Sequence, residues 1–257
     1  MEAIVWGEIR RIYQRSLKPA DSFFNLIIAR PLAAPFVMLF ARTRVTPNQI
    51  TFVSFAIMLV AAVLLAVIPG WLGLLLGVLA VELSYVFDCV DGQLARVTGR
   101  TSAVGSELDF LMDELKAFAL VGALGLRWYW HDGGGVFALY LAGGTLIVIG
   151  WALCLTKFVR SAEYAEATGT ARQGHGQAAG EARQRKGVLW PIKMAARFIS
   201  QYPACLPIFA AVDRLDVFLW AYGAVHVLYV GQTALVLVLK LGRFAPASDN
   251  AADGSSS

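Results

Sequence analysis

The sequence predicts an all-α membrane protein, a polytopic bundle of six transmembrane helices preceded by interfacial amphipathic helices. The first observation is composition, because 58% of the 257 residues are hydrophobic and 16% are charged, whereas soluble domains contain about 25% charged residues. The second is that the apolar residues form runs of about 20 or more, the length that a helix needs to cross a bilayer. Together with a mean hydropathy of +0.61, these features argue against a water-soluble globule and exclude a disordered chain.

Composition divides the chain into three parts. They are an N-terminal amphipathic and interfacial segment (1–45), a transmembrane domain (46–241) and a polar tail that we expect to be disordered (242–257).

The N-terminal segment is predicted to lie along the membrane surface. In residues 2–18, apolar side chains recur at helical spacing and basic side chains fill the remaining face, as in interfacial helices. A surface helix of a soluble domain is the alternative. Residues 23–41 are apolar but contain Arg30, Pro31 and Pro35. Because a proline inside a helix costs about 3 kcal/mol, we expect an interfacial segment here rather than a span.

The spans of the transmembrane domain are predicted from runs of apolar residues. Five of these runs are clear: 47–68, 71–97, 104–127, 135–160 and 215–240. A sixth, 188–212, is weaker because it contains Lys193, Arg197 and two prolines; without it the two termini would lie on opposite sides of the membrane. Residues 166–187 are rich in Gly, Gln and Arg and are predicted to form a flexible loop.

The distribution of basic residues predicts the orientation in the membrane. With six spans, 19 of the 22 Lys and Arg residues fall on one side. Because loops rich in Lys and Arg stay in the cytoplasm, we expect both termini and the loops 98–103 and 166–187 to face the cytoplasm, with the protein in the cytoplasmic membrane.

Four aspartates stand near the junction of the second and third spans, although most of the spans are almost free of acidic residues. Asp88 and Asp91 are three residues apart, and Asp109 and Asp113 are four apart, so each pair shares one face of its helix. A turn around 98–101 would bring the two pairs together near the cytoplasmic surface. Such an all-oxygen cluster favours Mg²⁺ or Mn²⁺. The alternative is a solvated acidic helix end, or pairing with nearby arginines.

The same residues form a longer motif. It is Asp88-x2-Asp91-Gly92-x2-Ala95-Arg96-x8-Gly105-x3-Asp109-x3-Asp113. All eight specified positions match the signature of the CDP-alcohol phosphatidyltransferase family, which this chain therefore resembles. The resemblance covers about residues 46–160, and it includes the segment Thr46-Pro47-Asn48-Gln49-Ile50-Thr51, which is similar to the family's start of the first span.

The resemblance implies a six-helix membrane enzyme that moves a phosphoalcohol group, commonly phosphatidyl, from a CDP-linked donor to an acceptor hydroxyl and releases CMP. Carried over position by position, Asp88, Asp91 and Asp109 become metal ligands. Asp113 becomes the general base and, in members with two metal ions, also a ligand, so two Mg²⁺ or Mn²⁺ ions are expected. The nucleotide site would be formed by Asn48, Thr51, Gly92, Arg96 and Ser102. Relatives are often homodimers, which makes a homodimer possible here.

Three of the nucleotide-site residues also have a purely structural interpretation. Gly92 would let a nucleotide approach the helix backbone, but a glycine also serves close helix packing. Arg96 offers two parallel donors to a phosphate, but it could extend to the membrane surface instead. Asn48 could equally be a polar residue at a helix start after Pro47.

The acceptor site is predicted from basic residues. Lys157 and Arg160 project together near the cytoplasmic end of the fourth span, and Lys193 and Arg197 could complete the pocket. In relatives with a phosphorylated acceptor, basic residues of this region hold the phosphate. The alternative is that these cations bind anionic membrane lipids. Lys116 is predicted to form a structural salt bridge with Asp113 or Glu114.

Phosphatidyl transfer from CDP-diacylglycerol to a polyol phosphate is the function predicted from these residues. A soluble donor such as CDP-choline, with a lipid or polyol acceptor, is the alternative within the family. A divalent-cation transporter is a more remote one, because its acidic residues should be spread through the membrane depth. A non-catalytic scaffold would be expected to lack some of the aspartates. Nothing in the sequence indicates a nucleic-acid partner.

Overall fold

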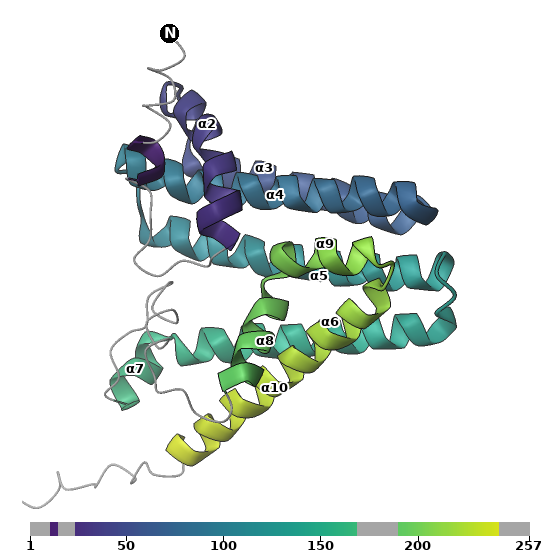
Figure 1. Cartoon of the computed structure of the whole chain (residues 1–257). Helices are drawn as coiled ribbons and strands as arrows, with labels where there is room; N and C mark the ends of the chain where they lie inside the picture. The colour runs from purple at the N-terminus through teal and green to yellow at the C-terminus, as the bar shows by residue number, and fades with distance from the viewer. Residues whose placement is uncertain (1–10, 15–23, 169–189, 242–257) are drawn as a thin grey trace, which may run out of the picture.

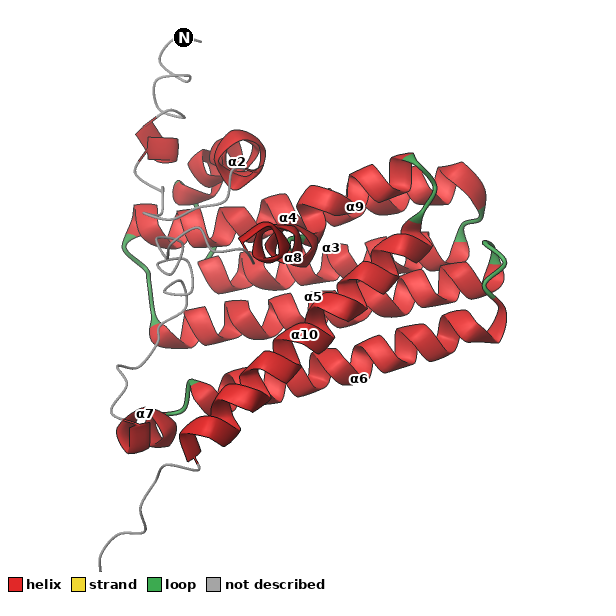
Figure 2. Ribbon diagram, turned by 60° about the horizontal axis from the view of Figure 1, so that its bottom comes forward, coloured by secondary structure: helices red, strands yellow, loops and turns green. Residues whose placement is uncertain are grey.

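The computed structural model describes residues 11–14, 24–168 and 190–241, and these residues form helices and connecting turns (Figures 1 and 2). The elements are η1 (Asn25–Ala29), α2 (Arg30–Ala41), α3 (Pro47–Val67), α4 (Gly70–Thr98), α5 (Ala103–Trp130), α6 (Gly135–Val159), α7 (Ala162–Thr168), α8 (Trp190–Ser200), α9 (Tyr202–Ala211) and α10 (Leu215–Leu241). The predicted all-α membrane bundle is confirmed.

Five long helices form the bundle. Both views show α3, α4, α5 and α6 running alongside one another, whereas α10 crosses them obliquely (Figures 1 and 2). By length and composition, α3, α4, α6 and α10 are able to cross a membrane. Helix α5 is as long, but its first half carries five charged residues that interrupt the apolar run: Glu107, Asp109, Asp113, Glu114 and Lys116. The count of six spans stays a prediction.

Capping residues fix the ends of the three helices that border the candidate site. Helix α3 begins with a capping box, in which the Thr46 hydroxyl accepts from the Gln49 amide and the Gln49 side chain accepts from the Thr46 amide, with Pro47 in the first turn. Helix α4 ends at Gly99, whose φ of 68° is left-handed and suits glycine. The Ser102 hydroxyl then caps α5 by accepting from the Gly105 amide at 2.9 Å.

The contact between α3 and α4 is close and polar at one point. The Ser54 hydroxyl donates to the Ser84 carbonyl at 2.8 Å, and the Ser84 hydroxyl donates to the Ser54 carbonyl at 2.8 Å. Both serines are buried. Because small side chains let helix backbones approach in a membrane, this reciprocal pair sets how α3 slides and rotates against α4, one turn from the predicted site.

The opposite end of the bundle is held by a buried arginine. Arg127 donates from Nη1 to the carbonyls of Leu65 and Ile68, at 3.3 and 3.1 Å, and from Nη2 to the carbonyl of Gly70 at 3.0 Å. It also forms an ion pair with Asp132 at 3.1 Å. Arg127 therefore supplies donors to carbonyls at the end of α3, where the last carbonyls of a helix lack partners of their own, and it links them to the first residue of α4.

The N-terminal segment is helical where the structure describes it. Residues 25–41 form the π-helical turn η1 and then α2, with Pro35 inside the helix. Helix α2 packs against α4 and is seen end-on in Figure 2, so it lies across the bundle. Of the predicted amphipathic helix 2–18, residues 11–14 are helical and the others lie outside the described residues. The predicted tail 242–257 also lies outside them.

The prediction of one continuous span over 188–212 is wrong. Two helices, α8 and α9, meet at Gln201, whose ψ of 69° is not helical. Pro203 lies in the first turn of α9, where a proline is tolerated because its missing N–H would have no partner there. Figure 2 shows α8 end-on and α9 along the bundle. With 10 residues, α9 is about 15 Å long, half the thickness of a bilayer core.

The loop predicted at 166–187 begins later than expected. Its first three residues complete α7, which ends at Thr168, and residues 169–189 lie outside the described part of the chain.

Candidate active site

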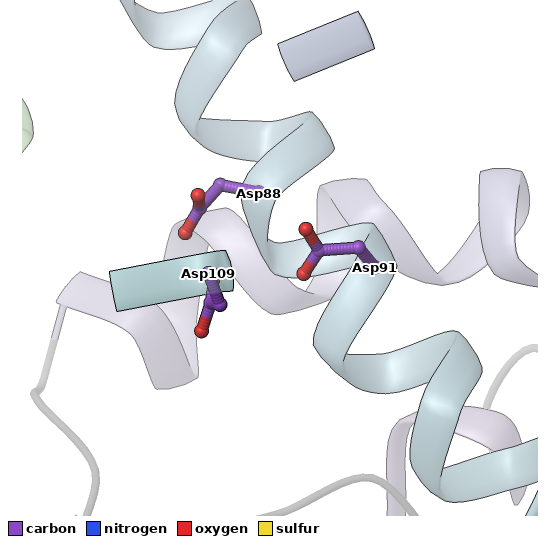
Figure 3. Close-up of side chains that lie close together, drawn as sticks. All are labelled: Asp88, Asp91 and Asp109. Atoms are coloured by element: carbon purple, nitrogen blue, oxygen red, sulfur yellow. The ribbon is translucent and has the colours of Figure 1, made fainter. Parts of the chain in front are cut away.

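Three of the four predicted aspartates come together in space. Asp88 and Asp91 project from α4 toward Asp109 of α5 (Figure 3). One carboxylate oxygen from each lies within 4.8 Å of the other two. The turn between α4 and α5 makes this possible, because it sets the two helices antiparallel. Residues near the end of α4 therefore lie beside residues near the start of α5.

The three carboxylates fit a hard divalent ion. Two oxygens that bind the same Mg²⁺ lie at most about 4.2 Å apart, since each Mg–O distance is about 2.1 Å. The oxygens here lie within 4.8 Å of one another, a difference that side-chain rotation can close. Three like charges on partly or fully buried side chains also repel one another. An ion of the Mg²⁺ or Mn²⁺ type would relieve this repulsion, and the all-oxygen ligand set suits both.

Thr51 orients one of the three carboxylates. Its Oγ1 donates to Asp91 Oδ2 at 2.5 Å, and both side chains are buried. The Pro47 carbonyl is a second acceptor for the same hydroxyl, at 3.2 Å. The resemblance places Thr51 in the nucleotide site. The structure shows its hydroxyl engaged with a predicted metal ligand, which is a contact that sequence reasoning missed.

The fourth aspartate has a different environment. Asp113 is not among the three converging carboxylates; its Oδ1 accepts from Lys116 Nζ at 3.2 Å. The same Nζ forms an ion pair with Asp88. Lys116 is fully buried, whereas the Asp113 side chain is 52% exposed. The predicted pairing of Lys116 with Asp113 is therefore observed, and the pairing with Asp88 across the helix interface is an addition. A carboxylate in this position is open to a substrate.

Gly92 and Arg96 lie together on α4. A Cβ added to Gly92 would come within 3.3 Å of Arg96 Nη1, so the guanidinium folds back over the glycine. A larger residue at position 92 would displace it. The two predicted nucleotide-site residues thus form one surface, with Gly92 providing the space that Arg96 occupies.

Asn48 and Ser102 meet at the start of α5. A Cβ added to Gly105 would lie 3.0 Å from Ser102 Oγ and 3.2 Å from Asn48 Oδ1. Gly105 therefore permits the close approach of α3 to the first turn of α5. The Ser102 hydroxyl is used as the helix cap.

The predicted acceptor residues of α6 face α5. Lys157 forms an ion pair with Glu107, and its Nζ lies 4.6 Å from the ring centre of Phe110. The guanidinium of Arg160 lies over the same ring at 5.1 Å. Its Nη1 is buried and makes no hydrogen bond within the described residues. Of the two cations, Arg160 therefore retains an unused donor, whereas Lys157 already has a carboxylate partner.

The second predicted acceptor pair, Lys193 and Arg197, lies on a different helix, α8. Arg197 is exposed on α8, and the side chain of Lys193 lies outside the described residues. Helix α8 packs against α9 and α10, so the structure does not bring Arg197 to α6 by any contact that it describes.

Comparison with known proteins identifies the family. The sequence model described as CDP-alcohol phosphatidyltransferase matches residues 44–228. The chain belongs to this family. That range begins just before α3 and includes all four aspartates and both cations of α6. The family and the long apolar helices together indicate an integral membrane protein.

Three curated relatives are similar in sequence to part of the chain. A phosphatidylinositol phosphate synthase of Corynebacterium glutamicum is 35% identical over 99 residues, which are 37% of this chain and 42% of the relative. One of Streptomyces avermitilis is 31% identical over 122 residues, 46% of this chain and 44% of the relative. An archaetidylinositol phosphate synthase of Aeropyrum pernix is 38% identical over 96 residues, 37% of this chain and 44% of the relative. The chain spans less than half the length of each.

Proposed function

We propose that this family member transfers a phosphatidyl group from CDP-diacylglycerol to a hydroxyl of a polyol phosphate, releasing CMP. The observation that carries the proposal is the convergence of Asp88, Asp91 and Asp109 within 4.8 Å, in a chain that matches the family over both contributing helices. A carboxylate cluster at one end of a bundle suits a reaction at the membrane surface better than a path through the membrane.

Asp88, Asp91 and Asp109 would hold the divalent ion, with Thr51 fixing the orientation of Asp91. When bound, Mg²⁺ or Mn²⁺ neutralises the donor diphosphate and stabilises the leaving phosphate oxygen. The contribution of the chain is to hold the carboxylates on two rigid helices, so that little reorganisation is needed when the donor binds.

Asp113 would act as the general base. It is exposed and lies one helical turn after Asp109, so an acceptor hydroxyl can reach it beside the donor. The proton of that hydroxyl passes to Asp113, its oxygen attacks the β-phosphorus, and the bond from that phosphorus to CMP breaks. Lys116 holds the Asp113 carboxylate in place during this transfer.

The donor nucleotide would lie over Gly92 and Arg96, with Asn48 and Ser102 at the edge of the same site. The guanidinium of Arg96 covers Gly92. A diphosphate would draw this guanidinium toward its own oxygens and uncover the glycine backbone. A planar guanidinium suits this contact because it presents paired donors to phosphate oxygens.

A phosphorylated acceptor is supported by Arg160. Its buried, unused Nη1 donor is costly unless an anion accepts from it. Two of the named relatives are phosphatidylinositol phosphate synthases and the third is an archaetidylinositol phosphate synthase, and an inositol phosphate is accordingly the acceptor that we propose first. Lys157 would assist by exchanging Glu107 for the acceptor phosphate, and Arg197 and Lys193 would add charge from α8.

The distribution of Lys and Arg supports an orientation with the site and both termini in the cytoplasm. A homodimer is compatible with the exposed apolar faces of α6 and α10. Surrounding lipids would cover the apolar residues left exposed.

CMP release tests this function. Purified full-length protein is given CDP-diacylglycerol or CDP-choline, each with inositol phosphate or inositol. We expect CMP only with CDP-diacylglycerol and inositol phosphate. Release with CDP-choline would favour the soluble-donor alternative.

An Arg160→Ala variant tests the acceptor site. Losing one charged hydrogen bond costs about 1.5–3 kcal/mol, so the acceptor KM should rise about 10- to 100-fold while the donor KM stays unchanged. Arg214→Ala, which removes an exposed arginine paired with Asp216 elsewhere, is the matched control. If Arg160→Ala leaves the acceptor kinetics unchanged, Arg160 does not bind the acceptor and acts only as a membrane anchor.

A further inference from the structure

Glu82 is an acidic residue near the middle of a membrane-spanning helix. It lies on α4, six residues before Asp88, and therefore about 9 Å from it along the helix axis. Its Oε1 is buried and makes no hydrogen bond within the described residues, and no described cation forms an ion pair with it. The residue as a whole is partly exposed, so a ligand beside α4 can reach it.

The start of α9 borders the carboxyl group of Glu82. Helix α9 packs against α4, and the hydroxyl of Tyr202 and the thiol of Cys205 lie close enough to Glu82 to interact with it electrostatically. The Tyr202 hydroxyl also interacts with Asp88 and Asp113. Glu82 and two carboxylates of the candidate active site therefore border one region of the bundle, with Glu82 nearer the middle of α4.

A carboxyl group in this setting is neutral. An isolated carboxylate among apolar side chains is very costly, and Glu82 has no cation that would offset this cost. In its neutral form, the group offers one O–H donor and a free acceptor, Oε1. At this depth a carbonyl oxygen suits the donor better than an anion does, because a charged ligand would have to lose its own hydration.

Resting on the function proposed above, we propose that Glu82 is a specificity-determining residue for the lipid donor: its carboxyl group donates a hydrogen bond to an ester carbonyl of the diacylglycerol. In this donor, the ester groups lie a few bonds from the reacting phosphorus, on the hydrocarbon side. With the phosphorus at Asp88, Asp91 and Asp109, the esters would extend toward the middle of α4, where Glu82 lies.

The residues beyond Glu82 suit the acyl chains of such a donor. Leu79 and Leu75 precede Glu82 by three and seven residues, so they share its face of α4. Both are exposed. A lipid whose ester is bound by Glu82 would therefore continue onto apolar side chains of the same helix face.

The linkage of the donor chains tests the proposal. The purified full-length protein is placed in lipid discs of ether-linked phosphatidylcholine, which has no ester carbonyls. CMP release is measured with inositol phosphate and either CDP-diacylglycerol or CDP-dialkylglycerol, in which ethers replace the esters. We expect the KM for the ester-linked donor to be lower by about 2- to 10-fold, as one neutral hydrogen bond would give.

Variants of Glu82 assign this preference to its carboxyl group. Glu82→Leu should raise the KM for CDP-diacylglycerol by about 2- to 10-fold and leave kcat and the KM for CDP-dialkylglycerol unchanged. Glu82→Gln keeps a donor and should keep the preference. Thr145→Val is the matched control, because it removes a buried hydroxyl of α6 that donates to the Leu141 carbonyl of its own helix. It should keep the preference.

Repeating the measurements in discs of ester-linked phosphatidylcholine separates the donor from the surrounding lipid. If the effect of Glu82→Leu appears only in those discs, Glu82 binds a lipid of the bilayer and the proposal is wrong. Equal weakening with both donors would show a packing effect and would also overturn it.

The unmodified protein provides a test that needs no variant. Equal KM values for the two donors in ether-linked discs would overturn the proposal even if Glu82→Leu fails to fold. If the unmodified protein releases no CMP from either lipid donor, the proposed function itself is contradicted.

Discussion

Replacing Thr51 by valine tests whether this residue acts on the metal site or on the nucleotide. Valine has nearly the same shape as threonine but lacks the hydroxyl that donates to Asp91 Oδ2 at 2.5 Å. The carboxylate of Asp91 is buried, so water does not readily replace the lost donor. Asp91 would then be less firmly oriented toward the ion.

The size of the effect follows from this contact. A hydrogen bond to a charged group contributes about 1.5–3 kcal/mol. Loss of a residue that orients a metal ligand typically weakens metal affinity by about 10- to 100-fold. We therefore expect the Kd for Mn²⁺ to rise by about 10- to 100-fold in Thr51→Val, with Thr51→Ser restoring most of the affinity because it keeps the hydroxyl.

Ser54→Ala is the matched control. Ser54 lies one turn further along α3, is also buried, and also donates to α4, but its acceptor is the Ser84 carbonyl. Its loss should lower thermal stability about as much as Thr51→Val does and leave the Kd for Mn²⁺ unchanged. Titration of purified protein with Mn²⁺, followed by electron paramagnetic resonance, measures that Kd directly.

One result would refute this reasoning. If Thr51→Val binds Mn²⁺ as tightly as the unmodified protein but binds the CDP-linked donor more weakly, Thr51 contacts the nucleotide and does not orient Asp91. Equal weakening of Mn²⁺ binding in Ser54→Ala would show that general loosening of the α3–α4 contact is responsible.

Further predictions concern the remaining site residues and the far end of the bundle. CMP release should stop in EDTA and return with Mg²⁺ or Mn²⁺; full turnover in metal-free buffer would contradict the proposed mechanism. Asp113→Asn should bind the donor but lose turnover, whereas Asp88→Asn should also weaken metal and donor binding, as a donor-binding assay can measure. Arg127→Met should lower the free energy of unfolding by about 3 kcal/mol, since three hydrogen bonds of about 1 kcal/mol each are lost, while kcat at low temperature stays unchanged.

Much of the fold could be predicted from the lengths and spacing of the apolar runs in the sequence. The runs of apolar residues predicted α3, α4, α6 and α10, because a bilayer demands about 20 apolar residues and internally satisfied backbone groups. The segment 188–212 was harder, since a proline is compatible with a helix start, a kink or a break. The structure shows that the helix breaks at Gln201 and that Pro203 lies in the first turn of a new helix, α9, which packs against α4 and α10.

The sequence by itself determined which residues share a helix face and what kind of ligand they offer. The spacing of Asp88, Asp91, Asp109 and Asp113 along two helices is a local property, and so is the turn that reverses the chain at Gly99.

Only the tertiary structure decided which faces meet. The rotation of one helix against another depends on many side chains at once, and no spacing within a single helix records it. It places Thr51 on Asp91, Lys157 on Glu107, and Lys116 between Asp88 and Asp113. For that reason the aspartate cluster and the pairing of Lys116 with Asp113 on one helix could be predicted from the sequence, whereas the contact of Lys116 with Asp88 became visible only when α4 and α5 were packed together.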